Sequence, residues 1–180
     1  MRSPMHEFTH FGHHHDLFDA TVTLDYERRQ KSRQRVVLDN GAEAGIVLSH
    51  GEKLTGGCVL RTTEGYCVRV VAGAETLSAV YSEDAHMLSR ASYHLGNRHV
   101  PVQIDPDCLR YLRDHVLDDM IRGLGLALVH ESSPFEPEAG AYAKHDHSHA
   151  HDDGQHHTAQ RGHEHPHTHE DHDSGSAGLR

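Results

Sequence analysis

Hydrophobic and polar residues alternate with a period of two between Thr21 and Val71, which is typical of short β-strands. Turn signals divide this region, above all Asn40-Gly41, because both residue types tolerate positive φ in a hairpin turn. A small β-domain of five or six strands is therefore expected. The predicted strands are residues 21–24, 35–38, 44–48, 59–62 and 66–71.

The pattern changes at residues 72–74, after which strands alternate with helices. Apolar residues recur at helical spacing from Leu88 to Leu95, and Ser82 or Asp84 can cap this first helix. Gly96-Asn97 predicts that the helix ends in a left-handed conformation.

A second helix is predicted from Asp114, with an apolar stripe that runs from Leu117 to Leu124. Strands are predicted at residues 76–81, 100–104, 108–112 and 126–130. The order β-α-β-β-α-β is that of a ferredoxin-like sandwich, so the fold class is α+β. The predicted divisions are a His-containing N-terminal extension (1–18), a β-rich domain (19–73), a ferredoxin-like domain (74–143) and a tail (144–180). Residues 135–142 are expected to fold back on the ferredoxin-like domain as its last ordered segment.

The tail from Lys144 to Arg180 holds eleven of the chain's 22 histidines, most of them at alternate positions. Imidazole has a pKa near neutrality and a free lone pair, so this density predicts binding of borderline-soft metal ions. No large apolar residue occurs between Tyr142 and Leu179, so burial cannot offset the entropy of ordering, and a disordered, multidentate segment is expected. The candidate ligands are His145, His147, His149, His151, His163, His165, His167 and His169.

Other interpretations of the tail are a solubilising segment without a specific ligand, or a purification tag. A tag is a run of consecutive histidines, whereas this segment is interrupted and acidic. Residues 163–167 match the zinc-protease pattern H-E-x-x-H, but that pattern needs a helix, which Pro166 forbids. The match is accidental.

The formal net charge is −10, to which the tail contributes about half, and this balance argues against nucleic acid as the main partner. Cys58, Cys67 and Cys108 are an odd number without C-x-x-C spacing, so they are expected to be small buried or half-buried side chains in a reducing compartment. No apolar run approaches 18 residues and residues 1–18 carry histidines instead of a hydrophobic stretch. We therefore expect no membrane segment and a cytoplasmic location.

One run of basic residues contrasts with the negative net charge of the chain, and it has two possible interpretations. It consists of Arg28, Arg29, Lys31, Arg33 and Arg35. The run is either a solvated strand or loop face, or a docking surface for an acidic protein partner. Catalysis is not expected, because the chain has neither a phosphate-binding G-x-x-x-x-G-K-[ST] loop nor a G-x-S-x-G nucleophile motif.

Histidines at helix ends are the candidate metal ligands of the folded part. His94 and His99 lie around the end of the first helix, and His115 opens the second. One or two imidazoles cannot close a metal site alone, but a two-fold axis would place His99 beside its own copy. Spacing alone leaves open whether His99 is a ligand or an ordinary surface histidine.

Three separated motifs resemble the UreE family of urease accessory proteins. They are YHLGNRHVP at residues 93–101, HVLDDM at 115–120 and PFEPEAGAY at 134–142. The resemblance covers residues 21–143 in register, and many members carry a His-rich tail.

The resemblance implies a metallochaperone that delivers Ni²⁺ to apo-urease together with the accessory GTPase UreG and the urease maturation complex. It also implies a peptide-binding-like β-domain, a ferredoxin-like metal-binding domain and a homodimer joined through the latter. The family's interfacial nickel ligand falls on His99. His115 matches an auxiliary position where members often have a second histidine, which is Arg113 here. Zn²⁺ and Cu²⁺ are competitors at such nitrogen ligands.

Two alternative functions remain at the level of sequence. The chain could store or buffer nickel, zinc or copper through its tail without a delivery partner. It could also be an assembly scaffold, in which the β-domain and the basic run hold partner proteins and the metal is secondary.

Overall fold

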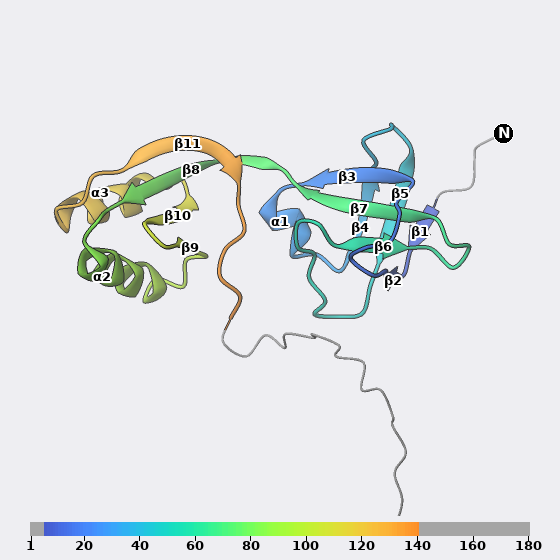
Figure 1. Cartoon of the computed structure of the whole chain (residues 1–180), viewed down its shortest axis with the longest axis horizontal. Helices are drawn as coiled ribbons and strands as arrows, with labels where there is room; N and C mark the ends of the chain where they lie inside the picture. The colour runs from blue at the N-terminus through green and yellow to red at the C-terminus, as the bar shows by residue number, and fades with distance from the viewer. Residues whose placement is uncertain (1–5, 141–180) are drawn as a thin grey trace, which may run out of the picture. The chain divides into compact units, whose positions relative to one another are not determined.

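The computed structural model describes residues 6–140 and begins with a β-rich part (Figure 1). Its elements are β1 (His6–Phe8), β2 (His10–Phe11), β3 (Ala20–Leu24), α1 (Tyr26–Arg29), β4 (Arg33–Val37), β5 (Glu43–Val47), β6 (Val59–Arg61) and β7 (Cys67–Ala72). One sheet has the strand order β1-β5-β4 and the other the order β2-β6-β7-β3. The alternating pattern therefore forms two sheets, with parallel pairing of β1 with β5 and of β3 with β7.

A single hydrophobic core holds these sheets together. Phe8, Val22, Ile46, Leu60 and Val68 are fully buried members of one cluster that draws on both sheets. Phe8 and Val22 have polar neighbours on both sides in the chain, as expected for strands with one face toward a core. Ile46 instead lies in a run of buried residues in β5. Each fully buried large apolar side chain stabilises the fold by about 1.5–3 kcal/mol.

Two features of this part differ from the sequence prediction. Residues 6–11, predicted to precede the first strand, form β1 and β2. The partner of β1 is β5, where Phe8 lies opposite Ile46, and no local pattern predicts a parallel pairing between strands so far apart in sequence. The short helix α1 was also not predicted, and it places part of the basic run on a helix.

The second part has the element order of a ferredoxin-like sandwich, which confirms that prediction. It contains β8 (Ala74–Tyr81), α2 (Ala85–Gly96), β9 (Gln103–Asp105), β10 (Cys108–Leu112), α3 (His115–Gly123) and β11 (Val129–Pro134). The strand order is β11-β8-β10-β9, and every neighbouring pair is antiparallel. Both helices pack on this sheet through one core cluster that includes Leu95, Ile121 and Tyr111 (Figure 1).

The helix starts were predicted correctly, and the limits of two strands were not. The side chain of Asp84 accepts hydrogen bonds from two backbone N–H groups of α2, and that of Asp114 does the same for α3. Strand β9 is shorter than residues 100–104, because Val100 and Val102 turn into the helix-side core before pairing begins. Strand β11 starts at Val129, later than predicted.

A short strap, residues 135–138, follows β11. Phe135 is fully buried, and its ring contacts that of Tyr26 edge to face, with 5.3 Å between centroids. The backbone N–H of Glu138 donates to the carbonyl of Val102 at 2.8 Å. The prediction that this segment folds back on the ferredoxin-like domain holds for its backbone bond to Val102, but Phe135 packs on the β-rich part instead. Residues 141 and 142 lie outside the described residues. Within the described part, no helix has both the length and the apolarity needed to cross a bilayer.

Candidate metal centre

His99 lies in a tight turn at the end of α2 that is closed by successive backbone hydrogen bonds. The N–H groups of Asn97, Arg98 and His99 donate to carbonyls of the last helical turn at 2.9–3.0 Å. Leu95 before the turn and Val102 after it are both buried in the core. The turn is therefore fixed by its backbone and by two apolar anchors, without using the imidazole.

His99 itself adopts the left-handed conformation predicted for Gly96-Asn97. Its φ is 54°, the only positive value among non-glycine residues that the structure describes, whereas Asn97 keeps a helical φ of −62°. Histidine is one of the few residue types enriched in this region of φ/ψ space. The side chain is exposed and makes no hydrogen bond to a described residue. An imidazole presented in this way is free to bind a ligand from outside the domain.

His115 is the first residue of α3 and is also exposed. The helix that carries it is held in place by Asp118, which is 3% exposed. One carboxylate oxygen of Asp118 accepts hydrogen bonds from Ser78 Oγ at 2.6 Å and Tyr111 Oη at 2.8 Å, and the other lies 2.8 Å from His130 Nε2. Three strands of the sheet are thereby joined to α3.

This network shifts the pKa values of Asp118 and Tyr111. Burial acts to raise the pKa of Asp118, but the hydrogen bonds from Ser78, His130 and Tyr111 outweigh it, and the pKa lies below its usual value. The pKa of Tyr111 is raised, first by burial and then by its hydrogen bond to the Asp118 carboxylate. Asp118 is therefore an ionised, structural carboxylate and not an available metal ligand.

The structure does not bring the predicted ligands together within one chain. Between residues 6 and 140, no group of three or more His, Cys, Asp or Glu side chains is placed to hold a metal ion. The predicted tail ligands fall outside the described residues: His145, His147, His149, His151, His163, His165, His167 and His169. Within the described part, His99 and His115 remain as two separate exposed imidazoles.

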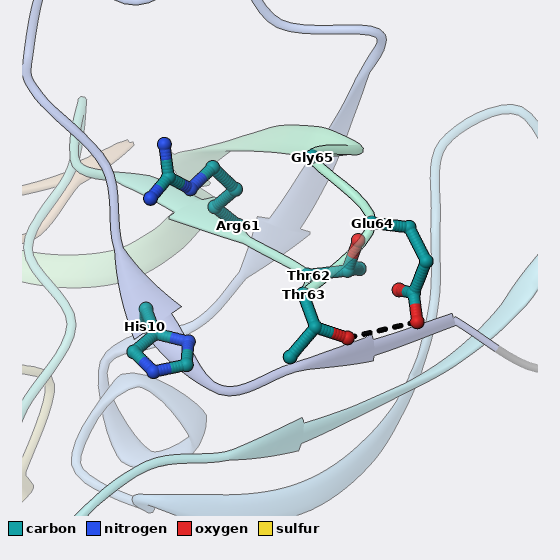
Figure 2. Close-up of a pocket in the computed structure, with 6 residues that line it drawn as sticks. All are labelled: His10, Arg61, Thr62, Thr63, Glu64 and Gly65. Carbon is teal, nitrogen blue, oxygen red and sulfur yellow. Dashed lines mark hydrogen bonds between the residues drawn. The ribbon is translucent and has the colours of Figure 1, made fainter.

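The histidines near the N-terminus belong to the β-rich part. The ring of His6 stacks on that of Tyr66, with centroids 4.1 Å apart. His10 lines a shallow pocket of about 460 Å³ with Arg61 and the turn at residues 62–65 (Figure 2). Figure 2 shows Thr63 donating a hydrogen bond to Glu64, at 2.8 Å, away from His10. With two potential ligand side chains, this pocket does not resemble a metal site.

Two residues with many buried contacts could not be recognised as such from the sequence. Asp118 lies beside the apolar stripe of α3, where an acidic residue next to Leu117 is a weak signal of a buried polar network. Arg29, in the basic run, is 1% exposed, so a solvated face does not describe it. The partners of both residues are distant in sequence.

Two family models match the chain, one for each part. The model described as "UreE urease accessory protein, N-terminal domain" matches residues 5–73, and that of the C-terminal domain matches residues 75–175. The two matched ranges lie on either side of Ala74, the first residue of β8. The N–H of the preceding Gly73 donates to the carbonyl of Leu24 at 2.8 Å.

Relatives from several bacteria match most of the chain. The urease accessory protein UreE of Pseudomonas putida (strain W619) is 59% identical over 134 residues, which are 74% of this chain and 83% of the relative. That of Alkalilimnicola ehrlichii is 59% identical over 124 residues, covering 69% and 76%. That of Aliivibrio fischeri (strain MJ11) is 41% identical over 165 residues, covering 85% and 100%. The chain therefore belongs to the UreE family of urease accessory proteins, which are non-catalytic nickel chaperones of urease maturation.

Proposed function

We propose that this chain carries Ni²⁺ as cargo to apo-urease through a site made by His99 of two copies, supplied by the His-rich tail. The observation that carries this proposal is the presentation of His99. Its imidazole is exposed on a rigid left-handed turn, and it is not engaged by any described residue. Since two imidazoles leave coordination positions open, the ion stays exchangeable, as delivery requires.

Exposed apolar side chains on the two helices support a dimer through the ferredoxin-like domain. Tyr93 on α2 and Val116 on α3 are 65% and 61% exposed. The backbone of Tyr93 is part of the His99 turn, since its carbonyl accepts the N–H of Asn97. Exposed large apolar residues next to a candidate ligand favour a protein interface there. A two-fold axis near the turn would pair the two His99 side chains.

Capture and transfer are assigned to different parts of the chain. The tail offers many interchangeable imidazoles, which raise the local nickel concentration near the dimer site. Neutral imidazole is the binding form, so each bound ion competes with protons. His115 is proposed as an auxiliary ligand. We further propose a cytoplasmic setting, in which the accessory GTPase UreG and the urease maturation complex receive the ion.

Calorimetric titration of nickel into a chain that ends after Ala143 tests this proposal. A single tight nickel ion per dimer is expected, and it should be lost in the same chain carrying His99→Gly. If neither chain has a tight site, nickel binding resides in the tail and delivery through His99 is contradicted.

The alternative is a storage or buffering protein for nickel, zinc or copper. The number of tail imidazoles favours high capacity, and capacity alone would suffice for storage. Deletion of the tail separates the two functions. A buffer loses its function with the tail, whereas a chaperone with a dimer site keeps much of its ability to activate urease.

A further inference from the structure

Arg29 is a buried cation, and its charge is balanced by one acidic group. It is among the largest fully buried side chains, although it belongs to a basic run that is otherwise exposed or half-buried. Its Nη1 donates to Glu136 Oε2 at 2.8 Å, and its Nη2 donates to the carbonyl of Phe135. A guanidinium that is this deeply buried is disfavoured when it loses its carboxylate partner. The Glu136 side chain is itself 42% exposed, so the pair lies at the edge of the buried region.

Glu136 binds the β-rich part with both of its carboxylate oxygens. While Oε2 accepts from Arg29, Oε1 accepts the backbone N–H of Gly56 at 2.8 Å. A Cβ at Gly56 would lie 2.4 Å from Glu136 Oε1, so alanine at this position would displace the end of the Glu136 side chain. The carboxylate therefore binds the Arg29 guanidinium and a backbone N–H group, and it fits against Gly56 because glycine has no side chain.

The backbone around Glu136 binds the ferredoxin-like part. The N–H of Glu136 donates to Gln103 Oε1 at 3.0 Å, and that of Glu138 donates to the carbonyl of Val102 at 2.8 Å. Val102 and Gln103 directly follow the turn that presents His99. The strap is thus hydrogen-bonded to the β-rich part through a side chain and to the His99 segment through its backbone.

The geometry points to Glu136 as a positioning residue of nickel delivery. Its carboxylate clasps the β-rich part to the strap, so that the β-rich part and the His99 turn are presented to a partner as one unit. We call the contacts of Arg29, Gly56 and Glu136 the clasp. This inference rests on the proposed function of His99, although the existence of the clasp can be tested without nickel.

Cys58 is a native reporter of the clasp. It lies two residues after Gly56, and burial raises the pKa of its thiol to about 11, with the charge of Glu136 adding to the increase and that of Arg29 opposing it. The thiolate is the form that reacts with alkylating reagents. If opening exposes Cys58, the pKa of its thiol falls toward its ordinary value of 9.0, which raises the thiolate fraction by up to about 100-fold.

Iodoacetamide labelling of the full chain at pH 8, followed site by site with mass spectrometry, measures opening. In Glu136→Ala and in Gly56→Ala, the labelling rate of Cys58 should rise at least about tenfold, while that of buried Cys67 stays unchanged. Gly56→Ala is the second variant because it displaces the carboxylate but keeps its charge. Faster labelling in both variants therefore argues against loss of the charge as the sole cause. Glu138→Ala in the same strap and Gly140→Ala, where a Cβ meets open space, are the controls.

Two further measurements separate the clasp from the proposed function. Nickel stoichiometry of Glu136→Ala should equal that of the unmodified chain, while urease activation falls severalfold at limiting chain concentration and recovers at high concentration. Unchanged Cys58 labelling in both variants overturns the clasp alone. Activation unchanged despite faster labelling overturns the positioning role. If a chain that ends after Ala143 keeps its tight nickel site when His99 is removed, the proposed function is overturned but the clasp is not.

Discussion

His99 and Asp118 illustrate how individual polar residues are used in opposite ways. The backbone of His99 is held by hydrogen bonds and its imidazole is left free, in a conformation that costs about 1–2 kcal/mol for most residue types. The side chain of Asp118 is fully engaged by Ser78, Tyr111 and His130, and is unavailable to any ligand. Burial and hydrogen-bond partners therefore decide which polar side chain is available to a ligand and which is not.

In a chain that ends after Ala143, replacement of His99 by glycine should remove the tight nickel site without harming the fold. Glycine relieves the positive φ, and this gain roughly offsets the greater entropy that glycine has in the unfolded chain, about 0.5–1 kcal/mol. Urea unfolding of His99→Gly should therefore give a free energy within about 1 kcal/mol of the unmodified chain. His99→Val is the contrasting variant, because a β-branched residue is poorly accommodated at φ 54° and should be clearly less stable.

Replacement of Asp118 by asparagine should lower the free energy of unfolding by about 2–4 kcal/mol at pH 7, since it weakens several charge-assisted hydrogen bonds at a buried site. Because the folded-state pKa of Asp118 is lowered from 3.8, its contribution is present above about pH 3.8 and is lost as pH falls through the folded value. The difference in free energy of unfolding between the two chains should thus shrink in acid.

The control is Asp119→Asn. Because its partner Arg122 is exposed, this replacement should change the free energy of unfolding by less than about 0.5 kcal/mol. Equal effects at the two aspartates would contradict this account.

At the scale of elements, the sequence predicted those strands and helix starts that depend on a local pattern of residues. The strands at residues 108–112 and around 76–81, and the starts of α2 and α3, follow from alternation, helical spacing and capping aspartates, and all were found. Strand β1 was missed because its stability comes from pairing with β5 and not from its own sequence. The proposed ligands His99 and His115 could be named from the sequence, and their role stays a prediction. Glu136 and Asp118 could not be recognised, because they find their partners through the folded topology.

Strand β1 should be needed for stability although it lies near the N-terminus. Phe8 is fully buried beside Ile46, so Phe8→Ala should lower the free energy of unfolding by about 3–5 kcal/mol. Phe11 in β2 is 40% exposed, and Phe11→Ala should cost less than about 1 kcal/mol. Urea denaturation followed by circular dichroism compares them. If the two variants were equally stable, residues 6–8 would not be part of the core.

At the scale of the whole molecule, charge and histidine content couple metal loading to pH. The formal charge of −10 favours divalent cations, whereas protonation of imidazoles below their ordinary pKa of about 6.5 removes ligands. The number of nickel ions bound should therefore fall steeply between pH 7.5 and 5.5, as measured by equilibrium dialysis. Loading that does not change across this range would show that histidines are not the main ligands.

The clasp also has a consequence for synthesis of the chain. Arg29 and Glu136 are 107 residues apart, so the cation leaves the ribosome long before its counterion exists. At about 5–20 residues per second, translation needs roughly 5–20 s to supply that carboxylate. Until then Arg29 must remain hydrated, and the β-rich part cannot bury it in the native manner. Completion of the first domain is thus timed by a residue near the end of the second.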